Sequence, residues 1–254
     1  MRNEPGQSGS ATSRFATSLM DLLDRVEYRR VRLEEQFDPV YRLRYEAYQR
    51  EGFIEINSQK VSGDAFDYSP NVVCYGVYID GRLVSSIRLH HVTPSERSSP
   101  SRVIYAERLD AILDAGKSYI DPSRFTADHE ATLAFPALPF LTLRIAAMAS
   151  EYFNADYCLS SVRPEHAAFY KRVFGSVQLE GERFYPGLKF PVCLYAAEVS
   201  TIRNRVANRF PFFMSTPTER EEMFGPGSEA RYLSLIQPTA RAAALAEERF
   251  VPAQ

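Results

Sequence analysis

The most restrictive feature of this sequence is a tight turn between two strand-like segments. Residues 72–79 and 83–89 are rich in valine, isoleucine, leucine and tyrosine, and Asp80-Gly81 stands where they meet. Asp-Gly readily adopts the positive φ angles of a two-residue hairpin turn. The pattern therefore predicts an antiparallel pair of strands, and such a pair is stable only when further strands or helices cover it.

Strand and helix patterns follow one another on both sides of this hairpin. Apolar or alternating runs predict further strands at residues 27–34, 119–126, 157–162, 177–184 and 192–199. Helix patterns occur at residues 18–25, 38–52, 140–153 and 164–175, and the second and fourth of these start at Asp or Pro and end at Gly. A strand, a helix and a strand in succession favour a parallel pair. We therefore expect an α/β (α+β) fold of three layers, with a central mixed β-sheet and helices on both faces.

Pro122 lies inside the predicted strand 119–126. Because proline cannot donate a ladder hydrogen bond, it predicts an edge, a bulge or a place where two strands part. The distinction bears on Asp121 and Arg124, which stand three residues apart. In a regular strand their side chains face opposite sides of the sheet, and only a bulge or a parting of strands brings them to one cleft.

The 254 residues divide into three predicted regions. Residues 1–17 start with a stretch rich in Gly, Ser, Asn and Gln and are expected to be disordered. Residues 18–200 contain the strands and helices of the main domain. Residues 201–254 form a helical or irregular C-terminal extension, in which helices are expected at residues 215–223 and 238–250.

Charge and apolar patterning exclude several broad classes of function. A formal net charge of -2 provides no bulk electrostatic attraction for nucleic acid or an anionic membrane. The chain shows no signal-peptide core or membrane-spanning run, so a cytoplasmic location is expected. Cys74, Cys158 and Cys193 lie far apart in the sequence. Their spacing matches neither a metal site nor a disulfide framework, so we expect buried thiols and no bound metal.

Five short motifs lie at intervals along the main domain. They are Arg44 followed four residues later by Tyr48, Asp64-Ala65-Phe66-Asp67, Arg88, Asp121-Pro122-Ser123-Arg124-Phe125, and the segment from His166 to Gly175. In this order, residues 27–199 resemble the GNAT acyltransferases, and more narrowly the branch of acyl-homoserine lactone synthases and N-acyl amino acid synthases. The resemblance implies a GNAT-like fold in which an amine attacks a thioester directly, with no bound cofactor and no nucleophilic side chain.

The resemblance also implies roles for individual residues. Asp121 is expected to be the base for the amine, directly or through a water, and Tyr170 to protonate the leaving thiolate. Substrate binding is assigned to the matching positions Arg44, Tyr48, Asp64, Asp67, Arg88, Ser123, Arg124 and Phe125. Structural alternatives stay open for several of them: Asp121 as a turn cap, Tyr170 as a core aromatic residue, and Arg44 as one half of a structural salt bridge.

Three departures from the lactone synthases concern the acceptor. The chain has no Trp, so Phe53 is the aromatic residue nearest to the expected position, while Asp121 stands for Glu and Tyr48 for Phe. These changes disfavour S-adenosylmethionine and favour an ordinary amino acid. We therefore expect an N-acyl amino acid synthase. The alternatives are an acyl-homoserine lactone synthase, which makes an autoinducer, and a non-catalytic GNAT-like module that binds acyl carriers or a partner protein.

The donor is expected to be an acyl-phosphopantetheine thioester, on acyl carrier protein or CoA. Residues 132–139 occupy the place of the pyrophosphate loop of GNAT proteins but contain no glycine. Backbone amides are then poorly placed to wrap a pyrophosphate, which favours acyl carrier protein over CoA. Such a carrier is acidic and needs a basic dock. The candidate docking residues are Arg102, Arg108, Lys117, Arg144, Lys171 and Arg172.

Overall fold

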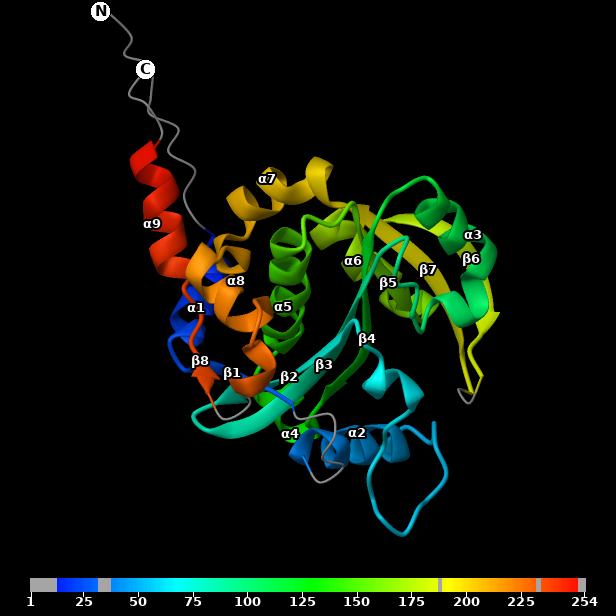
Figure 1. Cartoon of the computed structure of the whole chain (residues 1–254). Helices are drawn as coiled ribbons and strands as arrows, with labels where there is room; N and C mark the ends of the chain where they lie inside the picture. Colours follow the sequence, from blue (N-terminus) through cyan, green and yellow to red (C-terminus); the bar gives the residue numbers. More distant parts are fainter. Residues whose placement is uncertain (1–12, 32–37, 187–188, 232–233, 251–254) are drawn as a thin grey trace, which may run out of the picture.

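The computed structural model describes residues 13–31, 38–186, 189–231 and 234–250. These residues contain one mixed sheet of eight strands in the order β6-β7-β5-β4-β3-β2-β1-β8 (Figure 1). The strands are β1 (Val26–Arg30), β2 (Val72–Ile79), β3 (Arg82–Val92), β4 (Tyr119–Ala127), β5 (Tyr157–Val162), β6 (Val177–Phe184), β7 (Pro191–Glu198) and β8 (Leu235–Ile236). The sheet contains antiparallel pairs and one parallel pair, so the predicted α/β (α+β) class with a central mixed sheet is confirmed.

The predicted hairpin is formed by β2 and β3. Asp80 and Gly81 have φ angles of 50° and 76°, which are the left-handed values that a two-residue turn requires. Ile79 pairs with Arg82 directly beside the turn. The other edge of β3 pairs with β4. The hairpin therefore holds β4, which contains four of the ten predicted site residues, next to the middle of the sheet.

Strands β4 and β5 run parallel and then part. Their pairing consists of Tyr119 with Tyr157 and Ile120 with Cys158, and the described residues beyond these pairs form no further β4–β5 ladder. Pro122 stands two residues after Ile120, the last paired residue of β4. The expectation that this proline marks a place where strands separate is thus confirmed, and the separation leaves a gap in the middle of the sheet.

Strand β4 also contains a bulge on the side that faces β3. Ser86 pairs with Thr126 and Arg88 with Ser123, so the two residues Arg124 and Phe125 stand opposite the single residue Ile87. Arg124 has a φ angle of 50°, which is rare for a residue with a side chain and is found mainly where structure or function requires it. Because of the bulge, the β4 side chains beyond it point to the opposite face of the sheet from the one that regular alternation predicts.

The described helices are numbered α1 to α9 along the chain. They are α1 (Arg14–Leu23), α2 (Pro39–Arg50), α3 (Arg102–Asp114), α4 (His129–Ala134), α5 (Leu138–Tyr152), α6 (Ala167–Phe174), α7 (Val199–Arg209), α8 (Pro217–Phe224) and α9 (Ala240–Phe250). Short 3-10 turns are η1 (Ala65–Tyr68), η2 (Pro164–His166), η3 (Pro211–Phe213) and η4 (Ser228–Arg231). The predicted cap of α2 is present, because Asp38 accepts a hydrogen bond from the Val40 N–H. Gly175 ends α6 with a left-handed φ of 62°.

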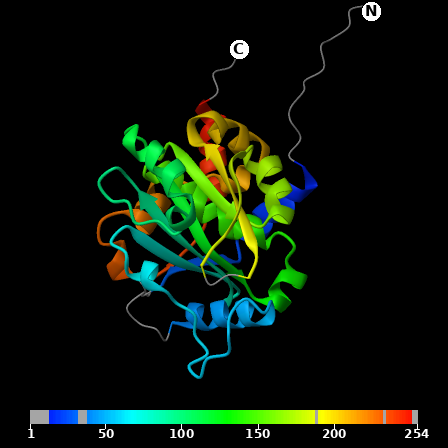
Figure 2. The ribbon, with the colours of Figure 1, turned by 90° about the vertical axis from the view of Figure 1, so that its right-hand side faces the viewer.

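Helices cover the two faces of the sheet, as predicted. Cys74 of β2 packs with Tyr41 of α2, and Val92 of β3 packs with Tyr105 of α3. Ile87 of β3 points the other way and belongs to the large core cluster around α5, against which side chains of α6 also pack. Helices α2 and α3 thus cover one face, here called the α2 face. Helices α5 and α6 cover the other, the α5 face (Figures 1 and 2).

Residues after β7 wrap around α5 and are part of the main core. Phe212, Phe213 and Met223 are buried in the same cluster as the α5 side chains, and helix α1 packs there too. β8 adds a strand next to β1 at the edge of the sheet. Helices α8 and α9 lie close to the ranges in which helices were expected.

Several boundaries differ from the sequence-based expectations. Residues 14–17, which were assigned to a disordered lead, form the first turn of α1, and residues 1–12 lie outside the described residues. β1 ends at Arg30, and the rest of the predicted strand falls largely on residues 32–37, which are not described. Helices α3, α4 and α7 were not predicted: α4 buries Ala131 alone, α7 buries Val206 alone, and α3 is interrupted by non-helical angles at Tyr105 (φ -124°, ψ 33°). No described helix is both long and apolar enough to cross a membrane.

Candidate active site

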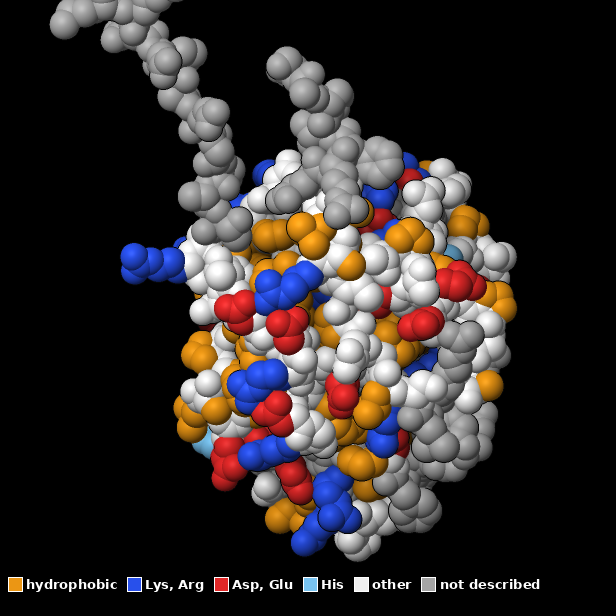
Figure 3. Space-filling model, turned by 90° about the vertical axis from the view of Figure 1, so that its left-hand side faces the viewer, with side chains coloured by type: hydrophobic (Ala, Val, Ile, Leu, Met, Phe, Trp, Pro, Cys, Tyr) orange, Lys and Arg blue, Asp and Glu red, His pale blue; other side chains and the backbone are white. Residues whose placement is uncertain are grey.

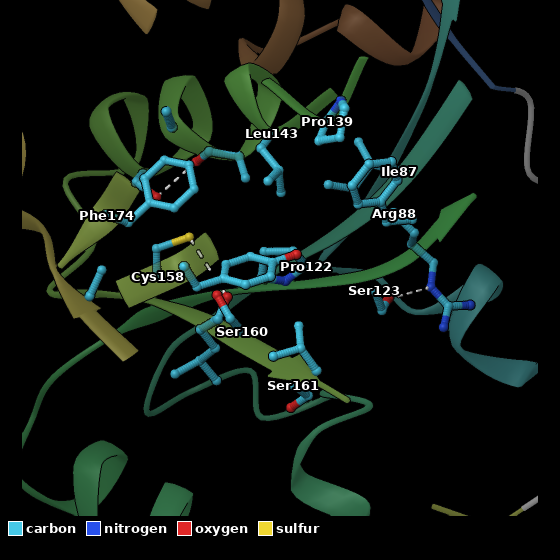
Figure 4. Close-up of a pocket in the computed structure, with 18 of the residues that line it drawn as sticks. Ile87, Arg88, Pro122, Ser123, Pro139, Leu143, Cys158, Ser160, Ser161 and Phe174 are labelled. Atoms are coloured by element: carbon cyan, nitrogen blue, oxygen red, sulfur yellow. Dashed lines mark hydrogen bonds between the residues drawn. The ribbon is translucent and has the colours of Figure 1, made fainter. Parts of the chain in front are cut away.

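A cavity of about 1130 Å³ passes through the sheet where β4 and β5 part. Its wall includes Tyr48 and Asp64 on the α2 face, and Leu143 and Phe174 on the α5 face. Figure 4 shows side chains of β3, β4, β5, α5 and α6 that converge on this space. Pockets for small molecules usually measure about 300–1,000 Å³. The cavity therefore has room for an extended ligand that reaches from one face of the sheet to the other.

Five of the predicted site residues form a connected arginine–aspartate cluster at the α2 end of the cavity. Asp67 Oδ1 lies 2.9 Å from Arg44 Nη1 and 2.9 Å from Arg88 Nη1. Asp64 Oδ1 lies 2.5 Å from Arg88 Nη1, and Asp64 Oδ2 lies 2.5 Å from Arg124 Nη2. Four separate motifs of the sequence thus meet in one network, which runs from the buried Arg44 to the cavity.

The Asp-x-x-Asp spacing explains how both carboxylates reach this cluster. Asp64 caps the turn η1 by accepting a hydrogen bond from the Phe66 N–H. Asp67 reaches back and accepts from the Asp64 N–H at 2.9 Å, which completes a capping box. The backbone of η1 therefore orients both carboxylates independently of the arginines.

The arginine–aspartate cluster carries an excess of positive charge, because three guanidinium groups face two carboxylates. Burial disfavours the charged form of Asp64, but the Arg88 and Arg124 guanidinium groups outweigh burial and hold its pKa well below the usual range. Arg44 is fully buried, whereas the Asp64 and Arg124 side chains remain 25% and 18% exposed. The cluster therefore presents its excess charge to the cavity through Arg124.

The bulge in β4 sets the position of Arg124. Its guanidinium carbon lies 5.3 Å from the centre of the Tyr48 ring, which is a cation–π contact. Ser123 accepts a hydrogen bond from Arg88 Nε at 3.1 Å (Figure 4). Phe125 lines the cavity. Six of the eight predicted substrate-binding residues thus line the cavity, Asp67 pairs with the lining residue Arg88, and Arg44 is connected to the cavity only through Asp67.

Asp121 occupies a different place from the one expected of a base in direct contact with substrate. Its carboxylate is fully buried and accepts hydrogen bonds from Ser99 Oγ at 2.6 Å, Ser101 N at 2.9 Å and Ser101 Oγ at 2.7 Å. Ser101 Oγ also lies 2.7 Å from Ser161 Oγ. Because Ser101 and Ser161 line the cavity and Asp121 does not, two serine hydroxyls connect this carboxylate to the cavity.

Tyr170 and Cys158 line the cavity on the α5 face. The Tyr170 hydroxyl makes no hydrogen bond to any described residue, and burial raises its pKa far above the ordinary value. Burial also raises the pKa of the Cys158 thiol to about 11. Both groups therefore stay protonated near neutral pH. A protonated thiol is a poor nucleophile, which fits the expectation that no cysteine takes the acyl group.

Sequence reasoning missed an aromatic group at the α2 mouth of the cavity. The rings of Phe53 and Phe190 have centroids 4.3 Å apart, and the Arg163 guanidinium carbon lies 5.6 Å and 5.4 Å from them. Tyr185 lines the same cavity. Phe53 had been considered only as a substitute for an absent Trp. Arg163 follows β5, whereas Tyr185 and Phe190 lie between β6 and β7, and they share no motif, so no local signal connected them.

The segment before α5 is built without backbone donors suited to a pyrophosphate. Residues 132–139 form the end of α4, a turn and the start of α5. Pro139 stands in the first turn of α5, where its ring nitrogen has no hydrogen to donate, and the N–H groups of Leu138 and Phe140 already donate to the carbonyls of Phe135 and Ala137. These observations agree with the expected absence of a glycine-rich loop at this position.

The candidate docking cations fall into two groups. Arg144 is fully buried and pairs with Glu219, so the expectation that it contacts a carrier is wrong. Arg102 and Arg108 are paired with acidic residues of this chain. Lys171 and Arg172 are exposed in the last turn of α6. They lie beside α7, whose Arg205 and Arg209 are also exposed, so the basic surface next to the cavity is on α6 and α7.

Comparisons with known proteins agree with this architecture. The family model described as N-acyl amino acid synthase FeeM matches residues 39–198, a range that includes every predicted site residue. The structure of FeeM, an N-acyl amino acid synthase from uncultured soil microbes, is 21% identical with a TM-score of 0.59, over 73% of this chain and 97% of that chain. A search of curated proteins finds no match.

Acyl-homoserine lactone synthases share the fold. BjaI, a CoA-dependent enzyme solved with SAM and isopentyl-CoA, is 14% identical with a TM-score of 0.51, over 73% of this chain and 89% of that chain. The AHL synthase LasI is 14% identical with a TM-score of 0.50, over 67% of this chain and 88% of that chain. Identities of this size demonstrate the GNAT-like fold and leave the substrates to be argued from the site.

Proposed function

Because this chain belongs to the FeeM family of N-acyl amino acid synthases, we propose that it makes N-acyl amino acids by transferring a fatty acyl group from acyl carrier protein. Membership establishes an N-acyltransferase. The finer assignment is supported by one observation: the same cavity has an excess of positive charge at its α2 end and apolar walls on the α5 face.

The acceptor is assigned from the charge of the arginine–aspartate cluster. A positive charge in a largely buried place is costly unless an anion accompanies it. The carboxylate of an amino acid supplies that anion, and the guanidinium of Arg124 can bind a carboxylate with two parallel hydrogen bonds. The aromatic group around Phe53 and Phe190 lies at the same mouth and provides apolar contact for the acceptor's side chain.

The donor is assigned from the opposite side of the sheet. Where β4 and β5 part, their described residues form no ladder with each other, so the facing backbone groups can bond the amides of a pantetheine arm. The α5 start offers no glycine loop for the pyrophosphate of CoA, whereas the exposed cations of α6 and α7 suit an acidic carrier protein. On the outer face formed by α1, α8 and α9, charges of both signs alternate (Figure 3). Because cations gather on α6 and α7 and charges of both signs mix on the face of α1, α8 and α9 (Figure 3), acyl carrier protein is assigned to a docking position beside α6.

The reaction needs one proton to leave the amine and one to reach the thiolate. The amine nitrogen attacks the thioester carbon, and the resulting tetrahedral centre expels the pantetheine sulfur. We assign the first proton to a relay in which Ser161 Oγ passes it to Ser101 Oγ and then to Asp121. Tyr170 supplies the second proton from its hydroxyl, since burial keeps that group protonated until the thiolate forms.

Product analysis with purified protein tests this proposal. Fatty acyl groups are supplied on acyl carrier protein or on CoA, together with a panel of amino acids, the matching amino acid amides, or S-adenosylmethionine. We expect mass spectrometry to detect N-acyl amino acids, with the carrier thioester used faster than CoA and the amides used poorly. Ser161→Ala should lower kcat without lowering the melting temperature.

Each arm of the assay can contradict one part of the proposal. A lactone formed from S-adenosylmethionine in place of N-acyl amino acids would support acyl-homoserine lactone synthesis. Equal use of amides and free amino acids would exclude a carboxylate site at Arg124. A faster reaction with CoA would exclude the carrier as the preferred donor, and an unchanged kcat in Ser161→Ala would exclude the serine relay.

A further inference from the structure

We propose that the C-terminal extension forms the far wall of the acyl channel and thereby limits the length of the fatty acyl chain that the enzyme accepts. The acyl channel is the part of the cavity on the α5 face. This inference rests on the proposed function for the identity of the ligand. The wall itself is a feature of residues beyond 198, where the match to the FeeM family ends.

Residues of α7, η3 and α9 line the channel. They are mostly small or aliphatic side chains: Ile202, Val206, Ala207, Phe213, Ala243 and Ala246. Ala243 and Ala246 lie three positions apart on α9, so their side chains share one face of that helix. Of these two, Ala243 is buried, whereas Ala246 is exposed to solvent. A larger side chain at Ala243, which is 8% exposed, would enter the channel.

The extension is anchored firmly enough to act as a wall. Arg144 of α5 forms a fully buried ion pair with Glu219 of α8, and Thr239 at the start of α9 donates to the same Glu219 carboxylate at 2.6 Å. Phe140 of α5 and Phe212 of η3 pack edge to face with ring centroids 5.6 Å apart. A ligand that meets this wall therefore encounters packed core, which resists displacement.

A polar floor marks where an apolar chain must stop. Glu151 pairs with Arg203 and, at 3.3 Å, with Arg220. Arg220 also donates to Ser215 Oγ at 2.9 Å. All four residues line the cavity. A terminal methyl group pressed against these ions would remove water from them without replacing its hydrogen bonds, which is unfavourable. The alanine wall and this floor together limit the chain that fits.

Three phenylalanine substitutions test the inference. Ala243→Phe fills the channel from α9, and Ala207→Phe fills it independently from α7, in case one variant fails to fold. Ala242→Phe is the matched control, because Ala242 is exposed on α9 and does not line the cavity. Two readouts are taken: the chain-length profile of the products, and the displacement of a fluorescent fatty acid by saturated fatty acids from hexanoic to octadecanoic.

We expect both channel variants to prefer shorter chains, with affinity for the longest chains lowered about fourfold for each methylene group that the ring excludes. The control should keep the profile of the natural sequence. Unchanged profiles in folded Ala243→Phe and Ala207→Phe would overturn the inference while leaving N-acyl transfer intact. Shifted fatty-acid displacement without transfer to any amino acid would instead contradict the proposed function and leave the role of the extension standing.

Discussion

Two buried groups of arginines and carboxylates lie in this protein, and they are built differently. The arginine–aspartate cluster on the α2 face has three guanidinium groups for two carboxylates, and it reaches the cavity through Asp64 and Arg124. The pair of Arg144 and Glu219 between α5 and α8 has one charge of each sign and is fully buried.

Hydrogen bonding separates the two groups further. Arg144 donates to both Glu219 oxygens and to two backbone carbonyls, and Glu219 also accepts from Thr239. Every strong contact of this pair is therefore made within the protein, so it has nothing left for a ligand. The α2-face cluster has an excess charge and partial exposure. The comparison indicates that charge balance and access, more than burial, separate a structural ion pair from a binding site.

Breaking the buried pair of Arg144 and Glu219 should have the largest effect, and this effect should be a loss of stability. Arg144→Ala leaves the Glu219 carboxylate buried without its partner, which should lower the free energy of unfolding by about 3–5 kcal/mol. Denaturant unfolding measures this change. The matched double variant Arg144→Met with Glu219→Leu removes both charges and should recover most of the loss. A loss below about 1 kcal/mol in Arg144→Ala would show that the pair is not closed to water.

Lowering the pH should reduce the stability of the protein through His90, which contacts η1 beside the arginine–aspartate cluster. Burial and the Arg88 guanidinium lower the pKa of this histidine from 6.5 to about 4, and its Nε2 lies 3.1 Å from the Phe66 carbonyl oxygen in η1. Between pH 6.5 and 4 the unfolded chain binds the proton and the folded chain does not, so the free energy of unfolding falls as pH is lowered. The full change is about 3 kcal/mol.

Unfolding measured at a series of pH values checks this expectation. His90→Gln should remove most of the dependence between pH 6.5 and 4. His91→Gln is the neighbouring control, since burial lowers the pKa of His91 as well, and it should remove a smaller part. The carboxylates of Asp64 and Asp67 have lowered pKa values, so their contribution is lost only below the ordinary aspartate range. A flat profile down to pH 4 in the natural sequence would contradict the assignment to His90.

Neutralising the excess charge should change acceptor binding more than stability. Arg124→Gln leaves two guanidinium groups for two carboxylates, and Asp64 keeps its partner Arg88. Loss of a charged hydrogen bond of about 1.5–3 kcal/mol corresponds to a KM for the amino acid raised roughly 10- to 100-fold. Arg124→Lys retains the charge and should be milder. Steady-state kinetics with the preferred amino acid measure this KM in each variant. An unchanged KM in Arg124→Gln would show that the acceptor carboxylate binds elsewhere.

The local sequence by itself determined most of the architecture. Asp80-Gly81 set the hairpin of β2 and β3, Asp38-Pro39 set the start of α2, and Gly175 set the end of α6. Pro122 marked the parting of β4 and β5. These features were predictable because turn angles, caps and a missing N–H act between neighbours in the chain. The Asp-x-x-Asp spacing likewise fixed the capping box that orients Asp64 and Asp67.

Only the tertiary structure decided which polar side chains share a cavity. A strand pattern alone put Asp121 and Arg124 on opposite faces, and the bulge opposite Ile87 shifted Arg124 by one residue. The link from Asp121 through Ser101 to Ser161 joins three distant segments, and Arg144 became buried because η3 and α8 contact it. The physical reason is the same in each case: burial and pairing depend on residues that are close in space but far apart in the chain, and their energies do not appear in any local pattern.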